Sequence, residues 1–290
     1  MTRVLVVGWF SFTEVIATVG DERAAQVVGG WLTGAGIAHD VAWARYLGRG
    51  VDHARVEPAG YTHLVWVCGP LVDDPLLTGL LDRFGAARRL AVGVSVVDPG
   101  TAARFDAVWA RDSPGERPRP DLAIDPPGDG PAVVATVFAP VQPEYGERGW
   151  HEHVQDVVER WIADRGLGCF DVATDLLTPT GHERRVAQVA AVLGRADVVV
   201  TSRLHGLVLG LGRGRPVVAV DPVVGGAKVS AQARALGWPV LLGADEVDAV
   251  ALDAALDRCL LPATPLLPAW ADIARSAADQ RARLLAALAG

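Results

Sequence analysis

Short runs of β-branched and other apolar residues alternate along the chain with longer segments in which apolar residues recur every three or four positions. The first pattern is typical of buried strands and the second of amphipathic helices, so their alternation predicts parallel sheets with crossover helices. In the first half of the chain, the predicted strands are 3–7, 39–43, 63–67, 90–96 and 107–110, and the clearest predicted helices are 21–32 and 73–84.

Residues 113–131 interrupt this pattern, because they are dense in proline, glycine and charge and predict an irregular connection. The same alternation then restarts. The predicted strands of the second half are 132–138, 168–172, 197–201, 216–220 and 239–242, and the predicted helices are 151–165, 183–193, 204–211, 229–236, 247–260 and 269–288.

We therefore expect an α/β protein with two Rossmann-like lobes whose parallel sheets face a cleft. The N-terminal lobe is predicted to span residues 1–130 and the C-terminal lobe residues 131–290, with the last helix packing back on the first lobe. In open α/β sheets, ligands bind beyond the carboxyl ends of the strands, so the turns that follow the strands are the places to search for a site.

Composition narrows the class of protein. Half of the 290 residues are apolar, which excludes general disorder, and the net charge of −7 makes an extended nucleic-acid interface unlikely, because neutralising phosphates needs a basic face. The isolated Cys68, Cys169 and Cys259 match neither a disulfide framework nor a zinc site. The first apolar run is too short for a signal peptide, and no run is long enough for a membrane span. We expect a cytoplasmic protein.

The cationic residues are unusually uniform. Of 27, only Lys228 is a lysine. An ammonium group is a compact charge with an adjustable pKa, which arginine cannot supply, so Lys228 is a candidate for a functional role. Chance survival of one lysine is the equal alternative.

The turn after residues 197–201 is the strongest candidate for a site. The strand is of buried type, and an apolar helical segment follows from Leu204. Ser202 is then predicted to be the N-cap, with Arg203 and His205 in the first helical turn. Free backbone N–H groups, a guanidinium and an imidazole would converge there, a combination suited to binding an anion and transferring a proton. A capped turn with a solvent-facing arginine is the alternative from spacing alone.

Glycines follow this turn at positions 206, 210, 212 and 214, and they predict a helix that packs closely on its sheet. Residues 151–153, His-Glu-His, look like a metal pair, but residues two apart on a helix point to different faces and do not readily share an ion. We therefore expect no metal site.

The second half resembles the polysaccharide pyruvyltransferase family. The segments that carry this likeness are 196–206 (ADVVVTSRLHG), 214–220 (GRPVVAV) and 225–229 (GGAKV). Arg203, Leu204 and His205 match the family's phosphoenolpyruvate-binding motif. The resemblance implies a fold similar to that of the GT-B glycosyltransferases and transfer of the enolpyruvyl group of phosphoenolpyruvate onto sugar hydroxyls, giving a pyruvate ketal and phosphate. It implies no cofactor beyond phosphoenolpyruvate as co-substrate.

The implied donor site consists of Ser202, Arg203, Leu204, His205, Gly206 and Lys228, with Arg203 and His205 as the catalytic residues. Weaker likenesses lie in the first lobe. Asp21, after Gly20, matches the family's Gly-Asp pair; Arg111 and residues 121–126 match segments near the lobe junction. The plain readings are an N-cap for Asp21 and a turn at Asp125-Pro126.

Two departures from the family bear on the site. Many relatives carry asparagine where this chain has Thr18, and the strand within residues 133–140 lacks the arginine that usually ends it. Arg148, His151 or His153 could take its place. We expect the apolar loop 9–19 to select the acceptor.

Two other functions stay open on the sequence. The first is a GT-B glycosyltransferase in which Arg203 and Lys228 hold the diphosphate of a nucleotide sugar; fold cannot separate it from a pyruvyltransferase, because function resides in the site. The second is a non-catalytic relative that keeps the anion pocket, which the missing arginine favours. The sequence specifies neither the acceptor nor the oligomeric state.

Overall fold

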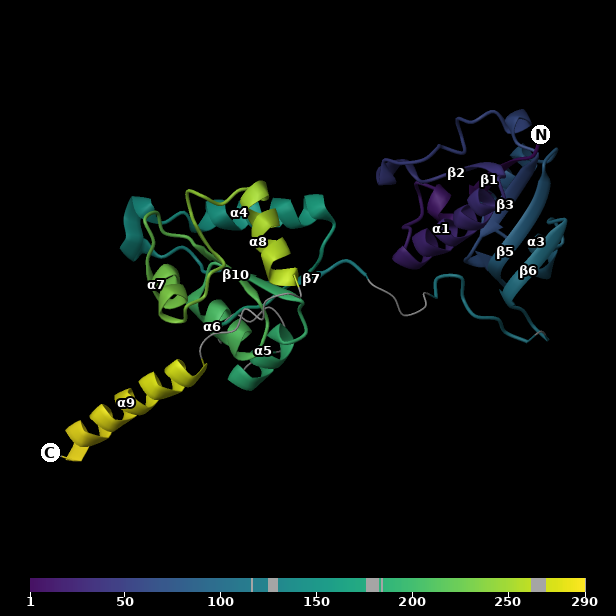
Figure 1. Cartoon of the computed structure of the whole chain (residues 1–290). Helices are drawn as coiled ribbons and strands as arrows, with labels where there is room; N and C mark the ends of the chain where they lie inside the picture. Colours follow the sequence, from purple (N-terminus) through teal and green to yellow (C-terminus); the bar gives the residue numbers. More distant parts are fainter. Residues whose placement is uncertain (116, 125–129, 176–182, 184, 262–269, 290) are drawn as a thin grey trace. The chain divides into compact units, whose positions relative to one another are not determined.

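The computed structural model describes residues 1–115, 117–124, 130–175, 183, 185–261 and 270–289. The chain divides into two compact units, Met1–Gly128 and Asp129–Gly290, each built around its own sheet (Figure 1). The division falls within the proline- and glycine-rich connection.

The sheet of unit 1 has the strand order β2-β1-β3-β5-β4, with β6 paired to β5, and its pairings are parallel. Its strands are β1 (Arg3–Val7), β2 (Ala38–Val41), β3 (His63–Val67), β4 (Pro70–Leu71), β5 (Arg88–Val96) and β6 (Ala107–Asp112). Its helices are α1 (Val19–Gly34), α2 (Pro75–Arg83) and α3 (Pro99–Ala102), with short 3-10 helices at Trp9–Ser11, Arg45–Leu47 and Pro58–Gly60.

Successive residues of β1 are buried on opposite faces of this sheet. Leu5 packs in the cluster that includes Leu77 of α2, whereas Val4 and Val6 pack in the cluster that includes Val28 of α1. Where a strand is covered on both faces its residues are apolar at successive positions, which is why β1 is apolar from Val4 to Val7 after the exposed Arg3.

The sheet of unit 2 has the order β11-β10-β9-β7-β8, and its pairings are also parallel. Its strands are β7 (Val133–Val137), β8 (Gly168–Asp171), β9 (Val198–Thr201), β10 (Val217–Asp221) and β11 (Leu241–Gly243). Its helices are α4 (His151–Arg165), α5 (Val186–Leu193), α6 (Leu204–Gly212), α7 (Lys228–Ala235), α8 (Ala249–Leu260) and α9 (Trp270–Ala289), and a 3-10 helix spans Pro143–Arg148.

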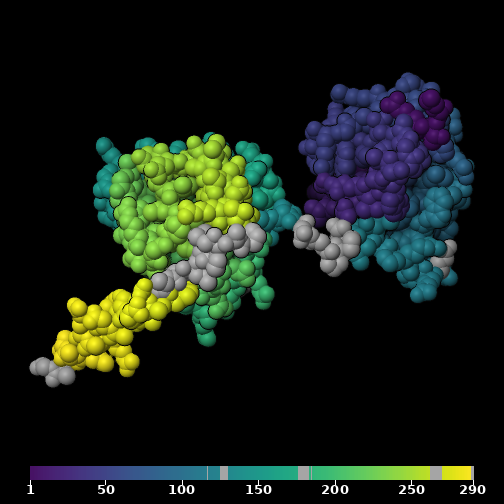
Figure 2. Space-filling model, viewed as in Figure 1, coloured from purple at the N-terminus to yellow at the C-terminus, as the bar shows by residue number. Residues whose placement is uncertain are grey.

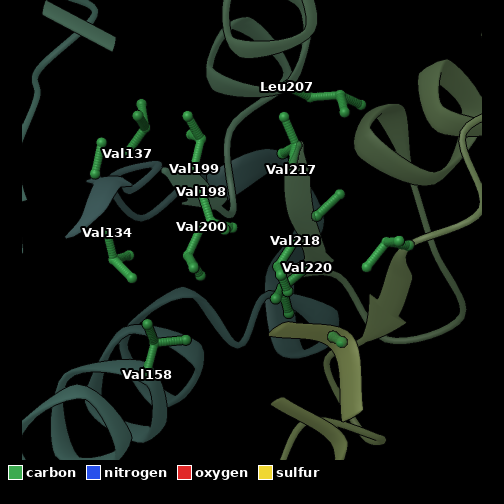
Figure 3. Packing of buried hydrophobic residues seen from close by; sticks show 14 of the residues in the cluster. Val134, Val137, Val158, Val198, Val199, Val200, Leu207, Val217, Val218 and Val220 are labelled. Carbon is green, nitrogen blue, oxygen red and sulfur yellow. The ribbon is translucent and has the colours of Figure 1, made fainter. Parts of the chain in front are cut away.

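Helices cover both faces of the second sheet. Val158 of α4 packs on one face and Leu207 of α6 on the other, with the strand valines between them (Figure 3). Fully buried residues form the core of unit 2, and Figure 2 shows one face of the side chains that cover it. No helix in the described part of the chain is long and apolar enough to span a membrane.

The predicted α/β class with two Rossmann-like units on parallel sheets is confirmed. The predicted strands and helices are present in the described residues, with ends displaced by no more than a few positions. Sequence patterns missed the two-residue β4, the short α3 and the 3-10 helices. The placement of the last helix on the first lobe and the facing cleft stay predictions.

Candidate anion-binding site

The turn between β9 and α6 is held by Thr201. Its hydroxyl donates to the carbonyl of Val137, at 2.7 Å, and accepts from the backbone N–H of Arg203, at 2.9 Å. The predicted N-cap at Ser202 is wrong, because α6 begins at Leu204 and its N-cap is Arg203. Ser202 is only 1% exposed, and its hydroxyl accepts from the N–H of Ala139, at 3.0 Å.

The Ser202 hydroxyl therefore ties the end of β9 to the segment after β7, while that of Thr201 shapes the turn. Each of these two roles needs a small side chain with a hydroxyl group, which Thr201 and Ser202 supply in succession. The Ser202 side chain is buried, and its backbone N–H donates to the carbonyl of Val137, at 3.2 Å, so both are used within unit 2. The donor contact at Ser202 stays a prediction.

Arg203 and His205 are the accessible side chains of the turn. The side chain of Arg203 is 22% exposed, and its Nη1 lies 4.0 Å from Oδ2 of Asp175. His205 is exposed, and Leu204 is half-buried. Arg203 is thus the N-cap of α6 and His205 lies in its first turn, and a carboxylate that the sequence did not reveal lies beside Arg203. The joint role of these groups in binding an anion stays a prediction.

Gly206 lets α6 lie against the sheet. A Cβ at this position would clash with the Thr201 hydroxyl and lie 2.8 Å from Cβ of Val137. Gly210 has a similar role, with a Cβ placed 3.0 Å from Val217. Gly212 does not share it, because no described atom lies within 4 Å of its Cβ position, and Gly214 instead follows the helix with φ +69°.

Arg203 lines a hollow of about 300 Å³ at the carboxyl edge of the sheet. The described residues that line it are Thr136, Phe138, Ala139, Pro140, Gln155, Asp171, Val172, Ala173, Asp175 and Arg203. They follow the ends of β7, β8 and β9, which is where an open parallel sheet binds ligands. Arg203 is the basic residue among these described lining residues. The segment 133–140, where relatives carry an arginine, contributes no basic side chain.

The neighbouring loop, from β10 to α7, is organised by Asp221. This carboxylate is fully buried and accepts from the backbone N–H groups of Val223 (3.1 Å), Ala227 (2.7 Å) and Ser230 (2.7 Å). Lys228 is the first residue of α7 and is exposed. A buried acid thus fixes the loop that presents the chain's one lysine.

A third segment crosses to this loop. Gly149 pairs with Val223 in an antiparallel bridge, and the N–H of Trp150 donates to the carbonyl of Pro222, at 2.8 Å. Arg148 donates to the carbonyls of Val224 (3.0 Å) and Gly226 (3.2 Å). The guanidinium of Arg148 is therefore used to hold this loop.

This crossing brings three loops to one place. Because β9 lies between β7 and β10, the segment from β7 to α4 passes the carboxyl end of β9 to reach the β10 loop. Ala139, near the start of this segment, donates its N–H to the Ser202 hydroxyl, so the segment is tied to the turn that carries Arg203.

His151 and His153 differ in environment. His151 is 3% exposed, and neither of its ring nitrogens has a hydrogen-bond partner among the described residues. Burial, and then the positive charge of Lys228, lower its pKa from the usual value. His153 is exposed and lies edge-on to Trp150, with ring centroids 5.4 Å apart. The described residues contain no group of three side chains suited to holding a metal ion.

The candidate residues of unit 1 are engaged in local structure. Oδ2 of Asp21 accepts from the N–H and the hydroxyl of Thr18, both at 2.8 Å, and Oδ1 accepts from Sγ of Cys68, at 3.2 Å. The expected N-cap is therefore displaced: Thr18 caps α1, and Asp21 completes the capping box. Threonine and asparagine are both good N-caps, which accounts for Thr18 where relatives carry asparagine.

Arg111 is also held by neighbours. It donates to the hydroxyl of Ser95 (2.6 Å), to Asp112 (3.1 Å) and to Asp121. These contacts join β5, β6 and the segment after them, so they give Arg111 a structural role within unit 1. Asp125 and Pro126 lie outside the described residues.

The apolar loop 9–19 is partly core. Phe10 is fully buried, and Phe12 is 3% exposed, so these rings are not presented to an acceptor. Ile16 is exposed, and the expectation that this loop selects the acceptor now rests on residues 13–17.

Comparison with known protein families identified a match within unit 2. Residues 145–222 match the model of the polysaccharide pyruvyl transferase family. The match begins at Tyr145 and contains Arg203, Leu204 and His205, whereas Lys228 lies beyond it. The resemblance is thus confirmed for this segment of unit 2, which carries the signature of a transferase domain. A search of curated proteins found no match.

Similar solved structures were also found. An Escherichia coli heptosyltransferase, WaaC with ADP, is 14% identical, with 89% of this chain and 99% of that chain covered and a TM-score of 0.27. A putative UDP-N-acetylglucosamine 2-epimerase from Listeria monocytogenes is 13% identical (88% and 87% covered, TM-score 0.28). The glycotransferase of kitacinnamycin is 14% identical (91% and 92% covered, TM-score 0.31).

Proposed function

We propose that the chain is a pyruvyltransferase that moves the enolpyruvyl group of phosphoenolpyruvate onto hydroxyls of a sugar or a sugar-containing metabolite. The products are a pyruvate ketal and phosphate. The observation that carries the proposal is the position of Arg203, inside the family match and in a hollow at the carboxyl edge of the sheet.

Arg203 is the donor-binding residue in this proposal. Its half-buried guanidinium can grip a carboxylate or a phosphate through two parallel hydrogen bonds, and the first N–H groups of α6 add to the attraction for an anion. The nearby Asp175 must give up its interaction with Arg203 when the donor enters.

His205 supplies the proton in the first chemical step. Protonation of the donor's methylene carbon makes the neighbouring carbon electrophilic, and an acceptor hydroxyl attacks it. Phosphate then leaves, and a second hydroxyl closes the ketal. Of the two hydroxyl protons, one replaces the proton that ends in the new methyl group and the other leaves with phosphate. Histidine is the side chain that most often acts as a general acid in proteins, and the imidazole of His205 is exposed.

Lys228 stabilises the phosphate as it departs, from the first turn of α7. The reaction needs no cofactor beyond phosphoenolpyruvate as co-substrate. We propose that the reaction takes place in the cytoplasm, because three unpaired cysteines suit a reducing compartment.

Thermal unfolding in the presence of phosphoenolpyruvate tests the donor. A ligand at about 100 times its dissociation constant adds about 2.7 kcal/mol to the free energy of unfolding. We expect stabilisation of the wild type and of Arg234→Ala, an exposed arginine on α7, and its loss in Arg203→Ala. Stabilisation by nucleotide sugars and not by phosphoenolpyruvate would instead identify a glycosyltransferase.

A turnover assay tests the enzyme. With a panel of sugar acceptors, His205→Gln should bind phosphoenolpyruvate but release no phosphate. Donor binding by the wild type without turnover on any acceptor would point to a non-catalytic relative, and full activity of His205→Gln would contradict the assigned proton transfer.

A further inference from the structure

His151 is a buried imidazole with unused hydrogen-bonding capacity. It is the first residue of α4 and is 3% exposed, and neither Nδ1 nor Nε2 has a partner among the described residues. A buried polar atom without a partner costs free energy, about 1–3 kcal/mol. A group that the structure does not contain is expected to satisfy it.

The surroundings of this imidazole are charged. The ring of Tyr145 stacks on it, with centroids 6.3 Å apart and planes at 29°, and the ammonium of Lys228 lies 6.0 Å from the centroid of Tyr145. The charged groups that act on His151 are Lys228 of α7, Asp221 at the end of β10 and Glu144 of the 3-10 helix.

The negative charge of Asp221 repels an incoming anion less than a free carboxylate would, because it is held by backbone N–H groups. Its two oxygens accept three backbone N–H groups and lie in the core of the loop. Lys228 is exposed and has no hydrogen bond or ion pair with another described side chain. The cluster therefore offers an ammonium and an imidazole to a ligand, beside the segment that pairs with the β10 loop at Gly149 and is hydrogen-bonded to Ser202 at Ala139.

We propose that His151 and Lys228 form a subsite for a doubly charged tetrahedral oxyanion, covered in the free protein by the ring of Tyr145. This subsite deepens the proposed function and rests on it for the identity of the natural ligand, which is either the phosphate group of the donor or the phosphate that is released.

The charges imply that this subsite takes up a proton with its ligand. In the free protein, burial and then the charge of Lys228 lower the pKa of His151, which favours the neutral imidazole. A dianion placed between them offsets the charge of Lys228 and adds two negative charges, which favours the imidazolium. His151 then becomes a second charged donor to the anion, and the proton is held ready beside the phosphate.

Sulfate is the probe that isolates this effect, because it keeps both negative charges through the neutral range, so any proton taken up belongs to the protein. Calorimetry of sulfate binding at neutral pH, in two buffers with different heats of ionisation, counts those protons. For the wild type we expect uptake of a fraction of a proton, up to about one, and affinity that rises by up to about tenfold per unit fall in pH.

Three variants locate the proton. His151→Gln should abolish the uptake and weaken sulfate binding about ten- to hundredfold, as expected for loss of a hydrogen bond to a charged group. Lys228→Met should lose binding, and Lys228→Arg should retain it. His153→Gln, which removes an exposed imidazole two positions further along α4, should bind sulfate with the same proton uptake as the wild type.

Unchanged uptake in His151→Gln, or unchanged binding in Lys228→Met, would overturn the proposal. Loss of sulfate binding in Arg203→Ala together with normal binding in Lys228→Met would do the same, by placing the ion at the Arg203 turn. Lys228 is on the surface, so its variants test the site even where substitution of the buried His151 prevents folding.

Competition separates the two sources of the anion. If the subsite holds the donor's phosphate, phosphoenolpyruvate and sulfate exclude each other and Lys228→Met weakens both. If it holds only released phosphate, inorganic phosphate displaces sulfate and phosphoenolpyruvate does not. Neither sulfate binding nor its proton uptake depends on pyruvyl transfer, so failure of the proposed function leaves this test intact, and the reverse also holds.

Discussion

The carboxylate of Asp175 lies 4.0 Å from the guanidinium of Arg203, so the cation that the site offers to a donor already faces an opposite charge. Both side chains are partly exposed, and pairs of this kind contribute about 0.2–1 kcal/mol. Asp175→Asn removes the competing charge, and we expect phosphoenolpyruvate to bind up to about fivefold more tightly, measured by calorimetry. Asp164→Asn, an exposed acid on α4, should leave the affinity unchanged. Weaker binding in Asp175→Asn would mean that this carboxylate orients Arg203 for the donor.

Gly206 should be sensitive to the smallest substitution. In Gly206→Ala, the new methyl group meets the Thr201 hydroxyl and the Val137 side chain, so α6 must move away from the sheet. Overpacking of this kind costs about 1–3 kcal/mol, which denaturant unfolding of unit 2 will show. The matched control is Gly212→Ala in the same helix, where the methyl group enters open space and the expected change is neutral or slightly stabilising. Equal effects of the two substitutions would contradict the close approach of α6.

The motif itself was visible in the sequence, but its contacts were not. An apolar strand followed by Ser202-Arg203-Leu204-His205 predicted the turn, its helix and its two accessible side chains, because these depend on neighbours in the chain. Which hydroxyl shapes the turn depends on Val137 and Ala139, which are more than sixty residues away in sequence. Local patterns carry no information on such partners.

The same reason explains the residues that were missed. Asp175 becomes a site residue because β8 and β9 flank β7, and Asp221 because its oxygens meet N–H groups later in the loop. Asp221 had one sequence signal, an acid at the end of a strand of buried type, where a charge needs partners. The burial of His151 was equally invisible, because the segment before it pairs with the β10 loop, more than seventy residues later in the chain.

Asp221 is expected to be the main support of the Lys228 loop. Asp221→Ala leaves three backbone N–H groups without their acceptor, and we expect a loss of about 2–5 kcal/mol in the free energy of unfolding of unit 2. Asp221→Asn keeps one oxygen acceptor and should lose less. Urea denaturation measures both, and Asp257→Ala, an exposed acid on α8, is the control. A loss no larger than that of the control would show that the loop holds without this carboxylate.

His151 should also make the stability of unit 2 depend on pH. Its pKa in the folded protein lies below the ordinary value of 6.5, through burial first and the charge of Lys228 second. Between the two values the unfolded chain binds more protons than the folded one, so stability falls as pH falls. The contribution is therefore complete above pH 6.5 and is lost as the pH drops below it.

Urea denaturation of unit 2 on either side of this value should show the loss, and His151→Gln should reduce it. The exposed His153 provides the matched variant, His153→Gln, which should keep the wild-type dependence. If His151→Gln weakens with acid as steeply as the wild type, some other group takes up the proton.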